Sequence, residues 1–148
     1  MPSTHTSLYY HIIFSTKERR PIISDRWRQN LYSYIGGILR RIGAVAQEIG
    51  GTADHIHILA SLGAAHRLSD VLREVKSVSC GWVRRVVRSP YFSWQDGYGA
   101  FTVSPSQIEF VETYIRGQQE HHRRTTFQEE YRALLVEHGI EFDEDHLW

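Results

Sequence analysis

The sequence contains almost no cysteine and no long apolar run. Cys80 is the single cysteine among 148 residues, which excludes an intrachain disulfide and a cysteine-based zinc cluster. No stretch approaches the roughly 20 apolar residues of a membrane span, and the first residues lack the pattern of a signal peptide. We therefore expect a cytoplasmic protein without a membrane partner. Its length fits one domain with a real hydrophobic core.

The chain has no formal net charge at pH 7, but its charged residues are unevenly distributed. The chain has 17 Lys and Arg against 17 Asp and Glu. Residues 125–148 contain seven acidic side chains and one basic side chain, which leaves a balance of +6 on residues 1–124. A basic body favours contact with nucleic-acid phosphates, and an acidic end could screen it. Ordinary solvated charge is the alternative explanation. We divide the chain into a domain over 1–124 and an acidic C-terminal helix and tail over 125–148.

The hydrophobic patterns predict an α+β fold. Their β-α-β-β-α-β order is that of a ferredoxin-like four-stranded antiparallel sheet with helices on one face and an open second face. A separate C-terminal helix carrying a tyrosine follows, and a short amphipathic helix is expected beyond residue 124. Strands are expected over residues 8–14, 44–49 and 55–62, with a turn at Gly50-Gly51, and residues 92–103 are expected to form an irregular approach to a fourth strand. Helices are expected over 26–42, 68–82 and 104–122.

The most informative motif is His55-Ile56-His57, inside an alternating apolar run. Successive side chains of a strand point to opposite faces, so both imidazoles lie on the same face. Two neighbouring imidazoles can converge on one divalent metal ion. Two polar residues on the wet face of a half-buried strand are the alternative. Asp54 is expected to point away from the histidines in a regular strand, so we do not predict it as a ligand.

A second group of reactive side chains lies on the expected helix over 104–122. At about 100° per residue, Tyr114, Gln118 and His121 fall within a narrow sector, with His122 next to it. A nucleophile and candidate metal ligands therefore share one edge of the helix. A core tyrosine beside solvated polar groups is the alternative.

Together these residues resemble the single-tyrosine HUH transposases, whose name abbreviates histidine, bulky hydrophobe, histidine. That family includes transposases of insertion sequences that move as single-stranded DNA and their REP-associated relatives. The resemblance rests on His55-Ile56-His57 followed by Tyr114-Ile-Arg-Gly-Gln118. It extends to the stretches 34–39 and 94–101 and covers residues 7–124, so the ordered combination is far more specific than either motif alone.

The resemblance implies a DNA transposase that cleaves and rejoins single-stranded DNA at hairpin-marked ends. Tyr114 would be the nucleophile that forms a 5′-phosphotyrosine link, with Mg²⁺ or Mn²⁺ as cofactor. The resemblance also implies a homodimer, in which the tyrosine helix of one subunit serves the histidine pair of the other. The implied metal ligands are His55, His57 and Gln118, and His121 and His122 are candidate contacts to the site or the DNA.

Basic side chains after the first strand and on the second helix are candidates for contacts to DNA phosphates. The same residue types are often simply solvated on a protein surface. The five candidates are Lys17, Arg19, Arg20, Arg73 and Lys76.

Three other functions remain open. A histidine-triad nucleotide hydrolase would need a third histidine where this chain has Leu59. Plasmid relaxases and replication initiators share the HUH chemistry but are usually larger and often order their motifs differently. The strongest alternative from another class is a non-catalytic ferredoxin-like module that binds single-stranded nucleic acid on its open sheet face. Substitution of Tyr114 by Phe distinguishes an enzyme from such a binder.

Overall fold

The computed structural model describes residues 3–147 and confirms the predicted α+β fold. Its centre is a four-stranded antiparallel sheet with the strand order β2-β3-β1-β4. Within residues 3–147, no helix is long and apolar enough to cross a membrane. The strands are β1 (Tyr9–Ser15), β2 (Val45–Gly51), β3 (His55–Ser61) and β4 (Gly99–Val103). The helices are α1 (Arg28–Arg41), α2 (Leu68–Trp82), α3 (Ile108–Arg116), α4 (Gln118–His121) and α5 (Phe127–Glu137). Short helical segments are η1 (Lys17–Arg19), η2 (Val83–Val87), η3 (Pro105–Gln107) and η4 (Glu144–His146).

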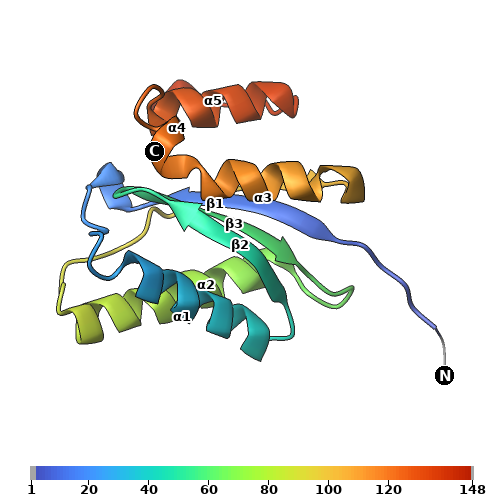
Figure 1. Cartoon of the computed structure of the whole chain (residues 1–148), viewed down its shortest axis with the longest axis horizontal. Helices are drawn as coiled ribbons and strands as arrows, with labels where there is room; N and C mark the ends of the chain where they lie inside the picture. Colours follow the sequence, from blue (N-terminus) through green and yellow to red (C-terminus); the bar gives the residue numbers. More distant parts are fainter. Residues whose placement is uncertain (1–2, 148) are drawn as a thin grey trace.

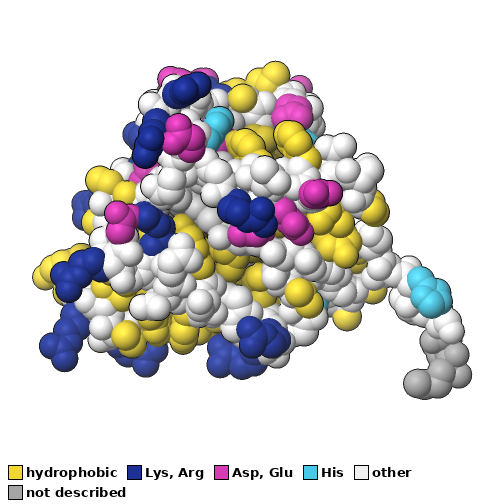
Figure 2. All heavy atoms as spheres, in the orientation of Figure 1, with side chains coloured by type: hydrophobic (Ala, Val, Ile, Leu, Met, Phe, Trp, Pro, Cys, Tyr) yellow, Lys and Arg dark blue, Asp and Glu magenta, His cyan; other side chains and the backbone are white. Residues whose placement is uncertain are grey.

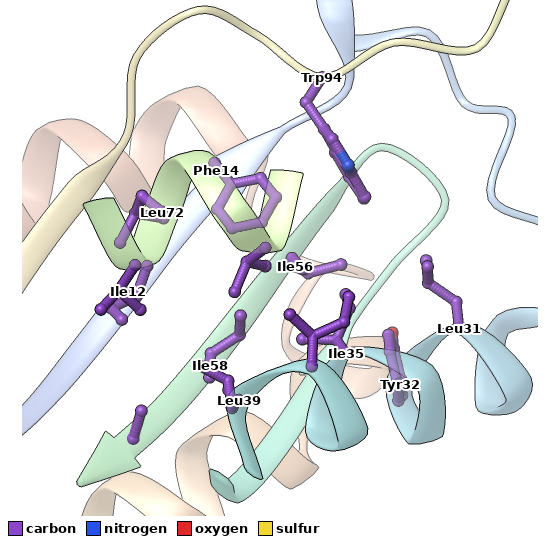
Figure 3. Close-up of a cluster of buried hydrophobic side chains, with 14 of the residues drawn as sticks. Ile12, Phe14, Leu31, Tyr32, Ile35, Leu39, Ile56, Ile58, Leu72 and Trp94 are labelled. Carbon is purple, nitrogen blue, oxygen red and sulfur yellow. The ribbon is translucent and has the colours of Figure 1, made fainter. Parts of the chain in front are cut away.

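The first face of the sheet packs against α1 and α2 (Figure 1). Because side chains alternate along a strand, Ile56 and Ile58 of β3 point to this face and leave the histidines on the other. Figure 3 shows them beside Ile35 of α1 and Leu72 of α2. All four side chains are at most 1 % exposed. This face therefore forms the larger apolar core of the domain.

The second face of the sheet is covered, so the prediction of an open face is wrong. Helices α3, α4 and α5 lie across it, on the side opposite α1 and α2 (Figure 1). Ile115 of α3 packs on Leu59, and Phe127 and Tyr131 of α5 pack near Ile13. These strand residues are apolar on the face that also carries the histidines, so leaving that face open would expose apolar surface to water.

The predicted helix over 104–122 is divided into η3, α3 and α4. Gly117 has a non-helical backbone (φ −90°, ψ 14°) between α3 and α4. The chain changes direction there, and α4 rises from α3 towards α5 (Figure 1). Glycine is the residue that a helix interior disfavours most after proline, which explains why the break falls at this position.

Gly50 and Gly51 do not form the predicted turn, because they are the last residues of β2. They pair with His57 and Ile56 of β3. A Cβ atom at Gly50 would lie 2.3 Å from the backbone oxygen of Ile115. The missing side chain therefore allows α3 to approach the sheet closely.

We predict that Gly50→Ala destabilises the fold by roughly 1–3 kcal/mol, because the new methyl group overlaps the α3 backbone. The matched control is Gly37→Ala in α1, where an added Cβ meets no atom within 4 Å of the described structure. Alanine should stabilise that helix by roughly 0.5–1 kcal/mol. Urea denaturation measures both changes, and equal stability of the Gly50→Ala variant and the wild type would contradict the close packing.

Candidate active site

Three histidines lie on the sheet face beneath α3, α4 and α5. His11 comes from β1, and His55 and His57 come from β3. The side chains of His55 and His57 are fully buried and His11 is 5 % exposed. His11 is diagonal to His57 across the two strands, since Leu59 is its direct partner and Ile13 is the partner of His57. Antiparallel pairing of β1 and β3 therefore adds a third imidazole to the predicted pair.

The carboxylate of Glu130, from α5, lies at the centre of the site. It accepts hydrogen bonds from Nε2 of His57 (3.0 Å) and Nε2 of His122 (3.0 Å). It also accepts from the side-chain amide of Gln118 (3.1 Å) and from the hydroxyl of Tyr114. Glu130 is only 4 % exposed. A buried charge is tolerated where several donors surround it in this way.

The protonation states follow from burial and these hydrogen bonds. Burial by itself would raise the pKa of Glu130, but the hydrogen bonds from His122 and His57 outweigh it and lower the pKa. Burial lowers the pKa of His57 to about 4 and, together with the charge of His57, the pKa of His11 to about 3. Around pH 7 the site therefore holds an ionised Glu130 and neutral His11 and His57.

Both histidines of the predicted pair have a partner on Nδ1 that orients the ring. Nδ1 of His55 lies 2.8 Å from Oδ1 of Asp54, and Nδ1 of His57 lies 2.8 Å from Nε2 of His11. The prediction that Asp54 points away is wrong, because Asp54 precedes the first residue of β3 and does not follow the strand alternation. Both Nε2 atoms face Glu130, at 3.6 Å from His55 and 3.0 Å from His57. Such outer partners orient metal-binding histidines.

The donor atoms in the site fit a divalent metal ion. Candidate ligand atoms of His55, His57, His122 and Glu130 lie within 4.8 Å of one another. Oε1 of Gln118 is 3.1 Å from Nε2 of His55. If His55 carries its proton on Nδ1 towards Asp54, these two atoms are both acceptors, and a cation between them would remove their repulsion.

His121 supports the same interpretation. Its Nε2 atom lies 3.3 Å from Oε2 of Glu130, yet it makes no hydrogen bond within the described structure although the atom is buried. Buried polar atoms are almost always paired, so an unpaired nitrogen points to a missing partner. The nitrogen faces the same carboxylate as the candidate ligands, and a bound ion or phosphate would be such a partner.

Tyr114 reaches this cluster from α3. Its ring centre is 5.8 Å from that of His57, and its hydroxyl donates to Glu130. Burial and then the negative charge of Glu130 raise the pKa of Tyr114 above its usual value near 10. Tyr114, His11, Phe110 and Glu130 line one cavity. The nucleophile candidate therefore borders a cavity and is protonated.

The six candidate residues of the site thus come together in one chain. The sequence analysis did not identify two further residues of the cluster, Glu130 and His11. Glu130 lies three residues after Phe127 and one before Tyr131, on the apolar side of α5, where a glutamate is unexpected and so informative. His11 lies two residues before Ile13 in β1, so both side chains are on the same face of the sheet. Ile13 packs under the helices that cover this face. The structure places the following predicted site residues next to one another: His55, His57, Tyr114, Gln118, His121 and His122.

The predicted DNA-contacting residues lie outside the cluster. Nζ of Lys76 donates to the carbonyls of Gln95 (2.8 Å) and Asp96 (3.3 Å), and burial lowers its pKa to about 8. Arg73 is exposed and pairs with Asp70 on the same helix at 2.6 Å. Lys76 therefore also holds the loop before β4. The DNA contacts of these residues, and of the three around η1, stay a prediction.

We predict that acid destabilises the metal-free protein through His11. Its lowered pKa means that the unfolded chain binds a proton more readily, so the stability is complete above about pH 6.5 and falls as the pH drops towards 3. At pH 5 this one residue lowers the free energy of unfolding by about 2 kcal/mol. Urea denaturation with a chelator at pH 7 and pH 5 should show a smaller loss for His11→Asn than for the wild type. An equal loss in both proteins would show that His11 is not responsible.

Comparison with known proteins identifies the family of the chain. The family model of IS200-like transposases matches residues 4–118, and no curated protein matches the chain. Two similar solved structures are a candidate transposase from Deinococcus radiodurans R1 and a REP-associated tyrosine transposase bound to a REP hairpin. The first is 22 % identical over 80 % of this chain and 95 % of its own, with a TM-score of 0.65. The second is 15 % identical over 82 % of this chain and 74 % of its own, with a TM-score of 0.60. At these identities the structures support the fold, whereas the family match spans most of the sequence. The chain belongs to the family of IS200-like transposases.

Proposed function

We propose that this transposase is a metal-dependent tyrosine endonuclease and strand transferase that acts on single-stranded DNA with hairpin ends. The observation that carries the proposal is the meeting of the Tyr114 hydroxyl and the His57 imidazole on one carboxylate, that of Glu130. Covalent phosphoryl transfer needs such a nucleophile beside a proton acceptor. The relative that was solved with a REP hairpin supports hairpin DNA as the substrate.

The metal would be held by the imidazoles of His55 and His57, the carboxylate of Glu130 and the amide oxygen of Gln118, with His122 in reach. Mg²⁺ and Mn²⁺ are the candidates. Mg²⁺ prefers oxygen ligands in a strict octahedron, whereas imidazole is a better ligand for transition metals. Of these two ions, the two imidazole nitrogens of this set therefore favour Mn²⁺. When bound, the ion supplies positive charge that polarises the scissile phosphate.

The protein side chains account for the covalent step. The hydroxyl oxygen of Tyr114 forms a bond to phosphorus while the bond from phosphorus to the 3′ oxygen breaks. This leaves a 5′-phosphotyrosine and a 3′ oxygen that takes a proton from water to become the free 3′-OH. Glu130 takes the tyrosine proton through the hydrogen bond that already exists. Because the pKa of Tyr114 is raised and that of Glu130 lowered, proton transfer accompanies the attack and does not precede it. A returning 3′-OH reverses the step and rejoins the DNA.

One chain contains all the groups that this reaction uses. Tyr114 lies beside His57 of its own chain, with ring centres 5.8 Å apart. The resemblance implied that a partner subunit supplies the tyrosine helix. The geometry within one chain does not require this. A homodimer stays a prediction.

We predict that Tyr114→Phe abolishes the covalent protein–DNA adduct and preserves DNA binding, since only the attacking oxygen is removed. The assay incubates protein with labelled single-stranded hairpin oligonucleotides and Mn²⁺ or Mg²⁺, followed by a denaturing gel. Electrophoretic mobility shift measures binding of the same oligonucleotides. Binding by the wild type without any adduct in either metal would favour the non-catalytic binding module.

We predict that Glu130→Gln lowers the rate of adduct formation by roughly 10²–10⁴-fold, because the amide cannot accept the tyrosine proton. Calorimetric titration should also show weaker Mn²⁺ binding. The matched control is Glu129→Gln, which neutralises the exposed neighbouring glutamate and should behave as the wild type. A faster Glu130→Gln enzyme would identify the carboxylate as an inhibitor of Tyr114 and overturn its role as base.

A further inference from the structure

A cleft away from the active site combines an exposed aromatic ring with two cations. It is lined by Tyr91, Lys17, Arg20, Ile22 and Ser93, together with Glu18. Tyr91 is 88 % exposed, more than any other large apolar side chain in the described structure. Exposed aromatic rings between cations are what proteins use to hold single-stranded DNA, because bases stack on the rings and phosphates meet the cations.

We propose that Tyr91, Lys17 and Arg20 bind the single-stranded DNA that flanks the scissile phosphate. The inference rests on the function proposed above and adds a subsite to it. A base would stack on the Tyr91 ring, and the two cations would contact the adjoining phosphates. The exposed pair of Arg20 and Glu18 (3.0 Å) does not oppose this, since surface ion pairs are weak and exchange readily for a phosphate.

A second cleft, across one segment of the chain from the first, borders residues of the active site. The segment Arg20–Ile23 separates the two clefts, because Arg20 and Ile22 line the first and Pro21 and Ile23 line the second. The second cleft is also lined by Asp54 and His122. Asp54 orients His55, and His122 donates a hydrogen bond to Glu130. A strand leaving the active site can therefore pass over this segment to Tyr91.

The backbone around the cleft is held in an unusual conformation. Glu18, Arg19 and Arg88 are the non-glycine residues with positive φ in residues 3–147, at 57°, 55° and 65°. Two of them lie in η1, and the third is three residues before Tyr91. Lys17 N donates to Ser93 O at 2.9 Å, which ties the two segments together. Non-glycine residues adopt this conformation at a cost and cluster at binding sites.

The surrounding charge is also positive. Arg84, Arg85 and Arg88 are exposed on η2 and the residue that ends it. Figure 2 shows Lys and Arg side chains gathered over the end of α2 and the following loop, at the lower left. This field would attract a polyanion to the cleft and extends the path beyond Tyr91.

The test measures binding of single-stranded oligonucleotides by fluorescence anisotropy, using Tyr114→Phe protein so that no cleavage occurs. Adding Tyr91→Ala should weaken binding of a long oligonucleotide by roughly 5- to 150-fold, the range for loss of one stacked base. Tyr91→Phe keeps the ring and should bind as the parent does. The matched control is Phe142→Ala, which removes another exposed ring, from the acidic tail, and should leave binding unchanged.

Stepwise shortening of the oligonucleotide locates the effect. The difference between Tyr91→Ala and its parent should vanish once the flank no longer reaches the cleft. Equal binding of the long oligonucleotide by both proteins, or a difference that persists at every length, would overturn the subsite. Absence of binding by the parent itself at every length would instead overturn the proposed function.

Discussion

The buried carboxylate of Glu130 is the interaction on which the rest of the site depends. It is the common acceptor for donors from β3, α3 and the end of α4, so it connects the sheet to the helices that cover it. Without it, the side chains of His57, His122 and Tyr114 would lose their common partner inside the protein, at the cost of unsatisfied buried polar groups. Burial and then this charge raise the pKa of Tyr114 and keep it protonated, and the carboxylate completes a set of ligand atoms suited to a metal ion.

Close packing of the covering layer is what brings that carboxylate to the histidines. Gly50 lets the α3 backbone approach β2, and the break at Gly117 turns the chain so that Gln118 meets His55. Aromatic packing of Phe127 on His55, with ring centres 4.3 Å apart, places the first turn of α5. The two faces of one sheet therefore have different tasks, because one is an apolar core and the other combines apolar packing with a polar network.

Local patterns predicted much of this arrangement. The alternation of β3 placed His55 and His57 on one face, and this holds because the two-residue period of a strand depends only on the backbone. The helical period grouped Tyr114, Gln118 and His121, although Gly117 interrupts the helix between the first two. The prediction for Asp54 failed because it extended the alternation of the strand to the residue that precedes it, where the backbone no longer follows the regular strand geometry.

The sequence by itself decided the α+β topology, the placement of His55 and His57 on one face, and the grouping of Tyr114 with Gln118 and His121. These features follow from periodicities that act over a few residues. Glu130 was visible in the sequence only as one charge of an acidic tail, and His11 as part of an apolar strand. His57 and Glu130 are 73 residues apart, and His57 and His11 are 46 apart. Only tertiary packing could bring them together, because a local pattern shows which face a residue occupies and not which distant segment will cover that face.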